Sequence, residues 1–162
     1  MAQEEQRGFA HTPEEGKAFW FLGALAIIML TSEQTQNAFA LQEHTYPKGT
    51  EPPPHIHHEQ DETWSILEGA VTITCGDQTW SASRGDYAFL PRGIVHSFKV
   101  VGATPLKLEV ITSPGGPLGF EHFVEAMGEP AQTLTPPPPA PPDMQKLLTL
   151  AAKYQIELLL PG

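Results

Sequence analysis

The middle of the chain alternates between apolar and polar residues. Residues 71–75 and 106–110 place an apolar side chain at every second position, and His96, Phe98 and Val100 alternate with Ser97 and Lys99. A period of two is typical of strands that have one buried face. The runs are short, and turns that contain Gly or Pro separate them. The sequence therefore predicts an all-β sandwich or barrel.

Two further strand candidates precede this region. They are the apolar segments at residues 18–30 and 37–46, which are separated by a polar turn at residues 31–36. Residues 47–54 then contain four prolines, a density that excludes a helix or a central strand and predicts an extended segment. Residues 1–17 are polar and are expected to form a loose N-terminal arm.

The pattern changes from strand to helix after Ser113. Apolar residues at positions 119–127, and again at 144–152, recur at the three-and-four spacing of a helical face. The intervening sequence TPPPPAPP is typical of a polyproline spacer, and Asp143 suits the N-cap position of the second helix. A final apolar stretch at residues 156–160 is a candidate strand.

These patterns describe one barrel domain with attached segments. A chain of 162 residues suits a single domain that can bury a core. The predicted division is a polar N-terminal arm at 1–17, a barrel domain at 18–134, a proline-rich linker at 135–143, and a C-terminal helix and short strand at 144–162. We expect this last segment to pack on the outside of the barrel, because its apolar helical face must be buried.

Charge and cysteine content exclude several classes of partner. The net charge of −10 argues against nucleic acid and against an anionic membrane surface. The single cysteine, Cys75, permits no internal disulfide, so a reducing, cytoplasmic location is expected. The apolar segment at residues 18–30 is shorter than the ~20 residues that a membrane-spanning helix needs.

Three histidines and a glutamate have the spacing of a metal site. His55 and His57 are two residues apart, so their side chains project to the same side of a strand. Glu62 lies near the start of the next expected strand, and His96 begins another. These side chains can meet only if the strands fold over one another, as in a rolled antiparallel barrel. Three imidazoles and one carboxylate suit a divalent transition metal.

The remaining histidines and the cysteine carry weaker signals. His58 neighbours the candidate site, but its side chain is expected to point the other way. Cys75 alternates with apolar residues and is expected to be a small core residue. The other histidines lack partners at ligand spacing and are expected to be surface or packing residues: His11, His44 and His122.

Two motifs resemble those of the cupin superfamily. Residues 49–69 read G-x5-H-x-H-x4-E-x6-G, and residues 85–96 read G-x5-P-x-G-x2-H. The resemblance implies a double-stranded β-helix, or jelly-roll barrel, here with a short C-terminal helix. The stretches AFWFLGAL, EHTYPKGTEPPPHIH and LAAKYQIELL resemble quercetin dioxygenase-like monocupins. One position departs from the superfamily pattern, since Val100 stands where the second motif usually has Asn.

The resemblance also implies a chemistry. One divalent transition metal would be held by His55, His57, Glu62 and His96, and Ni, Mn, Fe, Co, Cu and Zn are all compatible with these ligands. Glu62 would also be the catalytic base in the cleavage, by O2, of a flavonol or related enolic aromatic substrate. A homodimer is expected by analogy with the family. Four residues either line the substrate pocket or fill the barrel: Trp64, Ile66, Phe98 and Val100.

A second class of function stays open at this point. Superfamily members with the same four ligands include non-oxidative proteins, such as sugar or small-molecule isomerases and metal-dependent binding proteins, so the fold does not decide between them. A sugar pocket would need more inward-facing polar side chains, whereas Lys99, Lys107 and Glu109 are expected to face outward. The sequence therefore favours a flat apolar substrate over a sugar.

Overall fold

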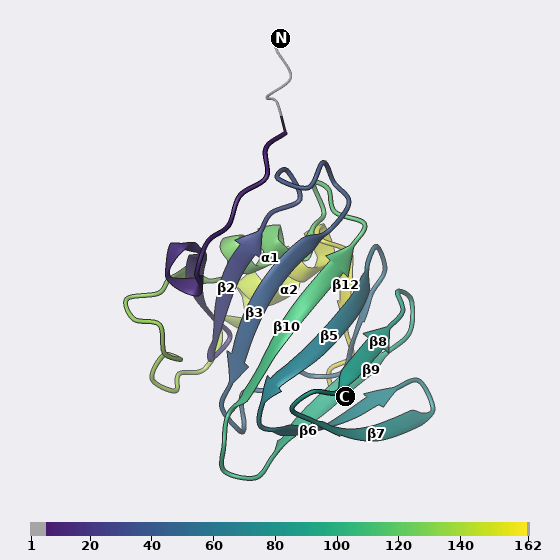
Figure 1. Ribbon diagram of the computed structural model, residues 1–162. Coiled ribbons are helices and arrows are strands. Elements are labelled where there is room, and N and C mark those ends of the chain that lie inside the picture. Colours follow the sequence, from purple (N-terminus) through teal and green to yellow (C-terminus); the bar gives the residue numbers. More distant parts are fainter. Residues whose placement is uncertain (1–5, 162) are drawn as a thin grey trace.

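The computed structural model describes residues 6–161, which form two antiparallel β-sheets rolled into a barrel. One sheet has seven strands in the order β11-β1-β2-β3-β10-β5-β8, and the other has five in the order β12-β4-β9-β6-β7. Figure 1 shows the long strands of the first sheet running side by side, with the shorter strands of the second sheet beyond β5. The predicted all-β jelly roll with a short C-terminal helix is confirmed.

The strands coincide with the alternating segments of the sequence. Within β6, β9 and β10 the apolar positions are buried and most of the residues between them are partly or fully exposed. The elements are, in chain order, η1 (Pro13–Glu15), β1 (Lys17–Phe21), β2 (Ala24–Leu30), β3 (Ala40–Tyr46), β4 (His55–His57), β5 (Asp61–Glu68), β6 (Ala70–Cys75), β7 (Gln78–Ser83), β8 (Tyr87–Leu90), β9 (His96–Val101), β10 (Leu106–Ser113), α1 (Phe120–Met127), β11 (Glu129–Pro130), α2 (Met144–Lys153) and β12 (Ile156–Leu158).

The apolar segment at residues 18–30 is a hairpin rather than one strand. Leu22 and Gly23 join β1 to β2, and both have positive φ values, of 51° and 84°. Two consecutive positive φ values suit a tight hairpin whose twist matches that of its strands. All residues of β2 from Ala24 to Ile28 are buried. A Cβ atom at Gly16 would lie 2.7 Å from Ile27, so the N-terminal segment approaches this strand too closely for any larger residue.

The predicted N-terminal arm is only partly described. Residues 1–5 lie outside the described residues, Pro13–Glu15 form a single 3-10 turn, and β1 already begins at Lys17. The strand expected at residues 37–46 begins at Ala40, because Gln36 and Asn37 adopt positive φ values of 53° and 63° in the preceding turn.

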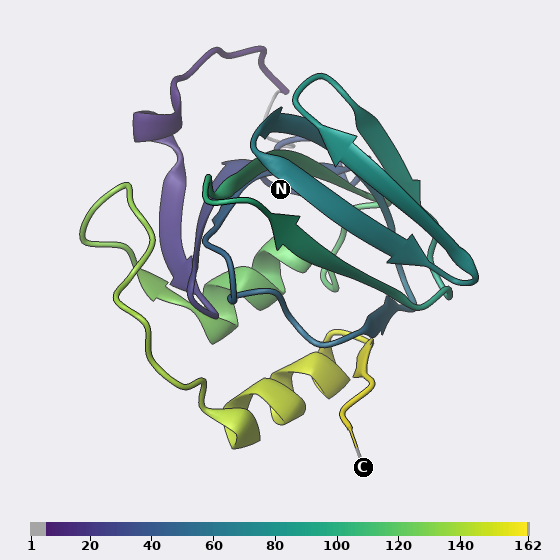
Figure 2. The same ribbon diagram turned by 90° about the horizontal axis from the view of Figure 1, so that it is seen from below.

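Two hydrophobic clusters hold the fold together. The first fills the barrel and includes Trp64, Phe98 and Leu108. The second lies between the β1–β2 hairpin and the helices and includes Phe123 and Leu147. Figure 2 shows the two helices side by side along one side of the barrel. Burying each large apolar side chain stabilises the fold by roughly 1.5–3 kcal/mol.

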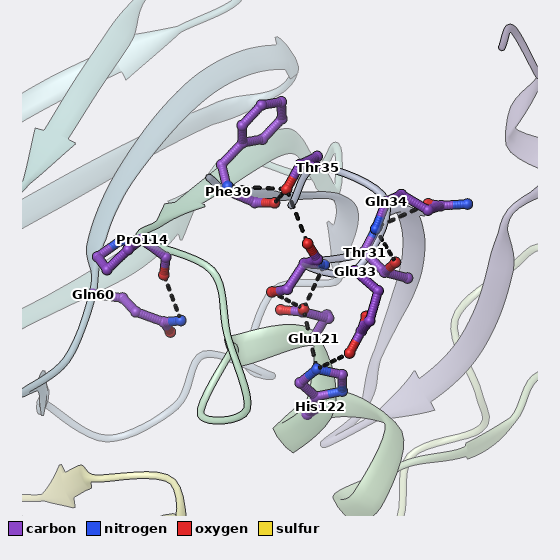
Figure 3. A network of polar contacts seen from close by, with 10 residues as sticks. Thr31, Glu33, Gln34, Thr35, Phe39, Gln60, Pro114, Glu121 and His122 are labelled. Carbon is purple, nitrogen blue, oxygen red and sulfur yellow. Dashed lines mark hydrogen bonds and ion pairs between the residues drawn. The ribbon is translucent and has the colours of Figure 1, made fainter. Parts of the chain in front are cut away.

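Helix α1 is tied to the loop after β2 through a buried carboxylate. Ser32 donates to Glu121 Oε1 from its backbone N–H, at 2.9 Å, and from its hydroxyl. Both side chains are almost fully buried. His122 Nε2 lies 3.1 Å from Glu33 Oε1 in the same network (Figure 3). A Cβ atom at Gly119 would collide with the Glu121 carboxylate, so a larger residue at the start of this helix would displace that side chain.

The C-terminal segment becomes part of the second sheet. Asp143 caps α2 by accepting from the Lys146 N–H at 3.0 Å, as its position in the sequence predicts. The chain then forms β12, which pairs antiparallel with β4. Upstream, the proline-rich segment is anchored where Trp20 Nε1 donates to Thr135 O at 2.8 Å. Among the described residues no helix is long and apolar enough to cross a membrane.

Candidate metal centre

Strands from both sheets place four polar side chains at one end of the barrel interior. His55 and His57 are the two ends of β4, so the pleat directs both inward. His96 begins β9 and lies opposite His55 in the antiparallel register. Glu62, the second residue of β5, comes from the other sheet. All four side chains are buried, with 3–8% of each residue exposed.

The four side chains converge on one point. One ligand nitrogen from each of His55, His57 and His96 lies within 4.8 Å of the others. The two oxygens of Glu62 face different imidazoles: Oε2 lies 3.1 Å from His96 Nε2, and Oε1 lies 3.6 Å from His57 Nε2. The predicted cluster is therefore assembled in space, although its members come from three different strands.

The hydrogen bonds around this cluster leave ligand atoms without partners. His55 Nδ1 donates to Pro53 O at 2.8 Å, which leaves its Nε2 lone pair for another ligand. Both ring nitrogens of His96, and Oε2 of Glu62, have no aligned hydrogen-bond partner among the described residues. Buried polar atoms are rarely left in this state. These orphaned atoms fit a divalent cation, because they combine neutral nitrogen donors with one carboxylate.

Electrostatics favour the protonation states that bind a metal. Burial lowers the pKa of His55 to about 3, helped by the neighbouring imidazoles, and burial also lowers the pKa of His57. Burial alone would raise the pKa of Glu62, but His57, His96 and His55 outweigh it and hold that pKa well below its usual value. Neutral imidazoles and an ionised carboxylate are the forms that ligate metals.

The cluster opens into a largely apolar pocket. The space in it that water-sized groups can occupy is about 50 Å³, within about 600 Å³ of empty space that includes open solvent. Trp64 and Phe98, two of the predicted pocket residues, line it, and their rings meet edge to face at 5.3 Å. Ile66 and Val100 are not among its lining residues; they lie in the hydrophobic cluster that fills the barrel. The inward position of Val100 is thus a packing position.

Several pocket residues are not apparent in the cupin motifs. His44, expected to be a surface or packing residue, is fully buried and lines the pocket with Tyr46. The alternation along the strand at residues 40–46 was a usable signal, since it places both side chains on the inward face. Phe120 also lines the pocket and packs edge-on against His57, with ring centroids 5.2 Å apart.

The C-terminal segment supplies part of the pocket wall. Leu147 of α2 and Ile156 and Leu158 of β12 all line it. The segment was expected on the outside of the barrel, but β12 extends the second sheet beside β4 and brings these side chains to the pocket. The C-terminal segment is far from residues 55–57 in the sequence, so no local sequence pattern predicts this contact.

The remaining histidines and the cysteine are not members of the cluster. His58 turns outward and pairs with Glu157 at 2.9 Å. Cys75 is buried in the barrel core, and burial raises the pKa of its thiol. His122 joins Glu33 and Glu121 in the network beside α1, and His11 packs against Phe9 with ring centroids 5.2 Å apart.

Two known proteins share parts of this sequence. The quercetin 2,3-dioxygenase of Bacillus subtilis is 26% identical over 124 residues, which cover 76% of this chain and 36% of that protein. The mannose-1-phosphate guanylyltransferase RfbM of Salmonella typhimurium is 36% identical over 69 residues, which cover 43% of this chain and 14% of that protein. The chain therefore spans only about a third or less of either relative.

Solved structures and a family model agree with the fold. The cupin domain of Schizosaccharomyces pombe Cnp3 superposes with a TM-score of 0.57 at 18% identity, covering 69% of this chain and 77% of that one. The polyketide cyclase RemF from Streptomyces resistomycificus gives 0.56 at 21% identity, covering 65% and 79%. The model of the cupin domain matches residues 42–112, which contain the whole candidate metal centre. Residues 42–112 therefore match the cupin domain, and the barrel has the fold of the cupin structures.

Proposed function

We propose that this protein is a metal-dependent cupin dioxygenase that cleaves a flavonol or a related enolic aromatic substrate with O2. The observation that carries the proposal is the position of Glu62, whose carboxylate lies between the imidazoles of His57 and His96 and faces an apolar pocket. A divalent metal bound there would supply a Lewis acid that holds a substrate oxygen and makes its hydroxyl more acidic.

In this proposal Glu62 is both a ligand and a proton acceptor. The histidines around Glu62 keep its pKa low, so the free carboxylate is a weak base. Proton transfer from the substrate to Glu62 therefore depends on a substrate hydroxyl that is itself acidic, as an enol is. His55, His57 and His96 serve as ligands, and burial lowers the pKa of His55 and His57, which keeps these two imidazoles neutral.

The walls of the pocket favour a flat aromatic substrate. Phe21, Trp64, Phe98 and Phe120 present rings, and no Lys, Arg, Asn or Gln is among the lining residues. A sugar would leave most of its hydroxyls without partners in such a pocket, at a cost for each buried polar group. The similarity to the quercetin dioxygenase also covers more of this chain than the similarity to the sugar-nucleotide enzyme.

An oxygen electrode tests this function. Purified protein loaded with one metal ion at a time, from the set Ni, Mn, Fe, Co, Cu and Zn, is mixed with a flavonol. We expect O2 uptake with at least one metal, and a loss of at least about 100-fold in Glu62→Gln while elemental analysis shows that metal is retained. Glu68→Gln, an exposed glutamate at the far end of the same strand, is the matched control.

Absence of O2 uptake with every metal would reject the oxidative function. The non-oxidative alternative, an isomerase or a metal-dependent binding protein, would then be preferred. The homodimer and the cytoplasmic location expected from the resemblance and from the single cysteine stay predictions.

A further inference from the structure

Strand β3 carries a second group of buried polar side chains, and two of them, His44 and Tyr46, line the pocket. Gln42, His44 and Tyr46 alternate along β3, and all three point into the barrel. His44 Nε2 lies 2.9 Å from Gln42 Oε1, and His44 Nδ1 lies 2.8 Å from the Tyr46 hydroxyl. Gln42 and His44 are fully buried, and Tyr46 is 8% exposed. The three side chains form one hydrogen-bonded chain on a single strand.

The hydrogen bonds of this group run in one direction, from Tyr46 to His44 and from His44 to Gln42. A carboxamide oxygen only accepts, so His44 must donate from Nε2 to Gln42 Oε1. The neutral ring then has an unprotonated Nδ1, which accepts from the Tyr46 O–H. The hydroxyl group of Tyr46 therefore donates its hydrogen to His44. The lone pairs of the Tyr46 oxygen receive no hydrogen bond from any other described side chain or backbone group.

The surroundings keep this group neutral and fixed. Burial lowers the pKa of His44 to about 4 and raises the pKa of Tyr46 far above its usual value. Phe120 stacks on the His44 ring at 5.9 Å, and Phe98 meets the Tyr46 ring edge to face at 5.0 Å. The pair is therefore suited to neutral hydrogen bonding and not to proton transfer.

One buried donor in the same pocket has no hydrogen-bond acceptor among the described residues. Trp64 lines the pocket and is 4% exposed, and its indole N–H has no acceptor among the described residues. Buried donors and acceptors that have no partner cost stability unless a ligand or water completes them. The pocket walls are mostly apolar, but the Tyr46 oxygen and the Trp64 N–H can each form a further hydrogen bond. Both groups are distinct from Glu62 and its histidines.

We propose that Tyr46 is a second recognition point for the substrate, held in place by His44 and Gln42. Its oxygen accepts a hydrogen bond from a substrate hydroxyl other than the one whose oxygen is bound at Glu62. The inference rests on the proposed function and narrows it. The substrate class becomes enolic aromatic compounds that carry at least one further phenolic hydroxyl, and Tyr46 is a specificity-determining residue.

Binding of two flavonols without O2 tests this recognition point. Quercetin carries several phenolic hydroxyls in addition to its enol, whereas 3-hydroxyflavone has the enol alone. Dissociation constants for both are measured by absorbance titration of metal-loaded wild type and Tyr46→Phe. We expect the preference for quercetin over 3-hydroxyflavone to fall by about five- to tenfold in the variant, the size of one net hydrogen bond.

The matched control is Tyr154→Phe. Tyr154 packs on Phe123 with ring centroids 5.9 Å apart and does not line this pocket. The same hydroxyl deletion there should leave the preference unchanged. Melting temperatures of all three proteins report any general loss of stability, which would weaken both flavonols equally.

The outcomes separate this inference from the proposed function. An equal loss for both flavonols in Tyr46→Phe, or no loss for either, overturns the recognition point, and so does failure of metal-loaded wild type to bind quercetin. If the preference depends on Tyr46 but O2 uptake is absent, the recognition point is supported and the dioxygenase function is rejected.

Discussion

Leu158 of β12 lies directly opposite His55 of β4 in the antiparallel register. Two backbone hydrogen bonds flank this pair, from His58 N to Gln155 O at 3.0 Å and from Leu159 N to Pro54 O at 2.8 Å. The last strand of the chain therefore borders the strand that carries two of the candidate ligands. A segment that the sequence describes only as a helix and a short apolar stretch thus pairs with a strand of the candidate metal centre.

Ending the chain at Leu134 should weaken both the fold and metal binding. The deletion removes α2 and β12, exposes the apolar residues that they cover, and frees the outer edge of β4. We expect a lower melting temperature, lower solubility, and metal affinity reduced by about 10–100-fold, as for the loss of groups that orient ligands. Calorimetry and metal titration measure these quantities. Unchanged values for both would show that the segment has no structural link to the site.

A second prediction concerns the carboxylate that anchors α1. Ser32→Ala removes the hydroxyl that donates to Glu121 Oε1 and leaves a fully buried carboxylate with fewer donors. We expect the free energy of unfolding to fall by about 1–3 kcal/mol, as measured by urea denaturation. Ser81→Ala, at an exposed position on β7, is the control and should change stability by less than about 0.5 kcal/mol. Equal stabilities of the two variants would contradict the role of this contact.

The sequence predicted the convergence of the four side chains of the candidate metal centre because its motifs encode geometry locally. His55 and His57 share a strand face by spacing alone, and the cupin resemblance placed Glu62 and His96 beside them. No sequence pattern predicted that Glu121 is buried, since a glutamate on a short helix is expected to be exposed. It is buried only because Ser32, 89 residues away, supplies its donors.

The pocket was harder to predict than the ligands. Trp64 and Phe98 were predicted from the alternation of inward and outward side chains along a strand. The same alternation also selected Ile66 and Val100, which fill the core instead. It separates the inside of a barrel from the outside, whereas the depth of a residue along the barrel decides which inward side chains reach a cavity. Depth depends on strand register and on segments such as β12, which no local pattern specifies.

Burial of His44 should make the metal-free protein less stable in mild acid. The pKa of His44 is about 4 in the folded protein and 6.5 as a reference value. Between these values the unfolded chain binds a proton that the folded protein does not, so stability falls as the pH decreases. The slope should reach about 1.4 kcal/mol per pH unit for this residue. His55 adds to the slope in the same direction, because its folded pKa is about 3.

Urea denaturation between pH 7 and pH 5 measures this slope. Over this range Glu62 stays ionised in both states, so it contributes little. His44→Gln should reduce the dependence of unfolding free energy on pH, whatever its effect on stability at pH 7. An identical slope in the variant and the wild type would show that His44 is not kept neutral by burial.

Removing any single imidazole from the cluster should abolish tight metal binding. His57 Nε2 and His96 Nε2 each face one oxygen of Glu62, and His55 Nδ1 is fixed by Pro53. We expect one bound metal per chain in the wild type and less than about 0.1 in His57→Ala or His96→Ala, measured by elemental analysis of protein purified without a histidine tag. Metal at 100 times its dissociation constant should stabilise the wild type by about 2.7 kcal/mol and leave His57→Ala and His96→Ala without this stabilisation. His58→Ala is the control, because that side chain turns outward to Glu157. Full metal content in His57→Ala and His96→Ala would mean that the convergence of these side chains does not form the metal site.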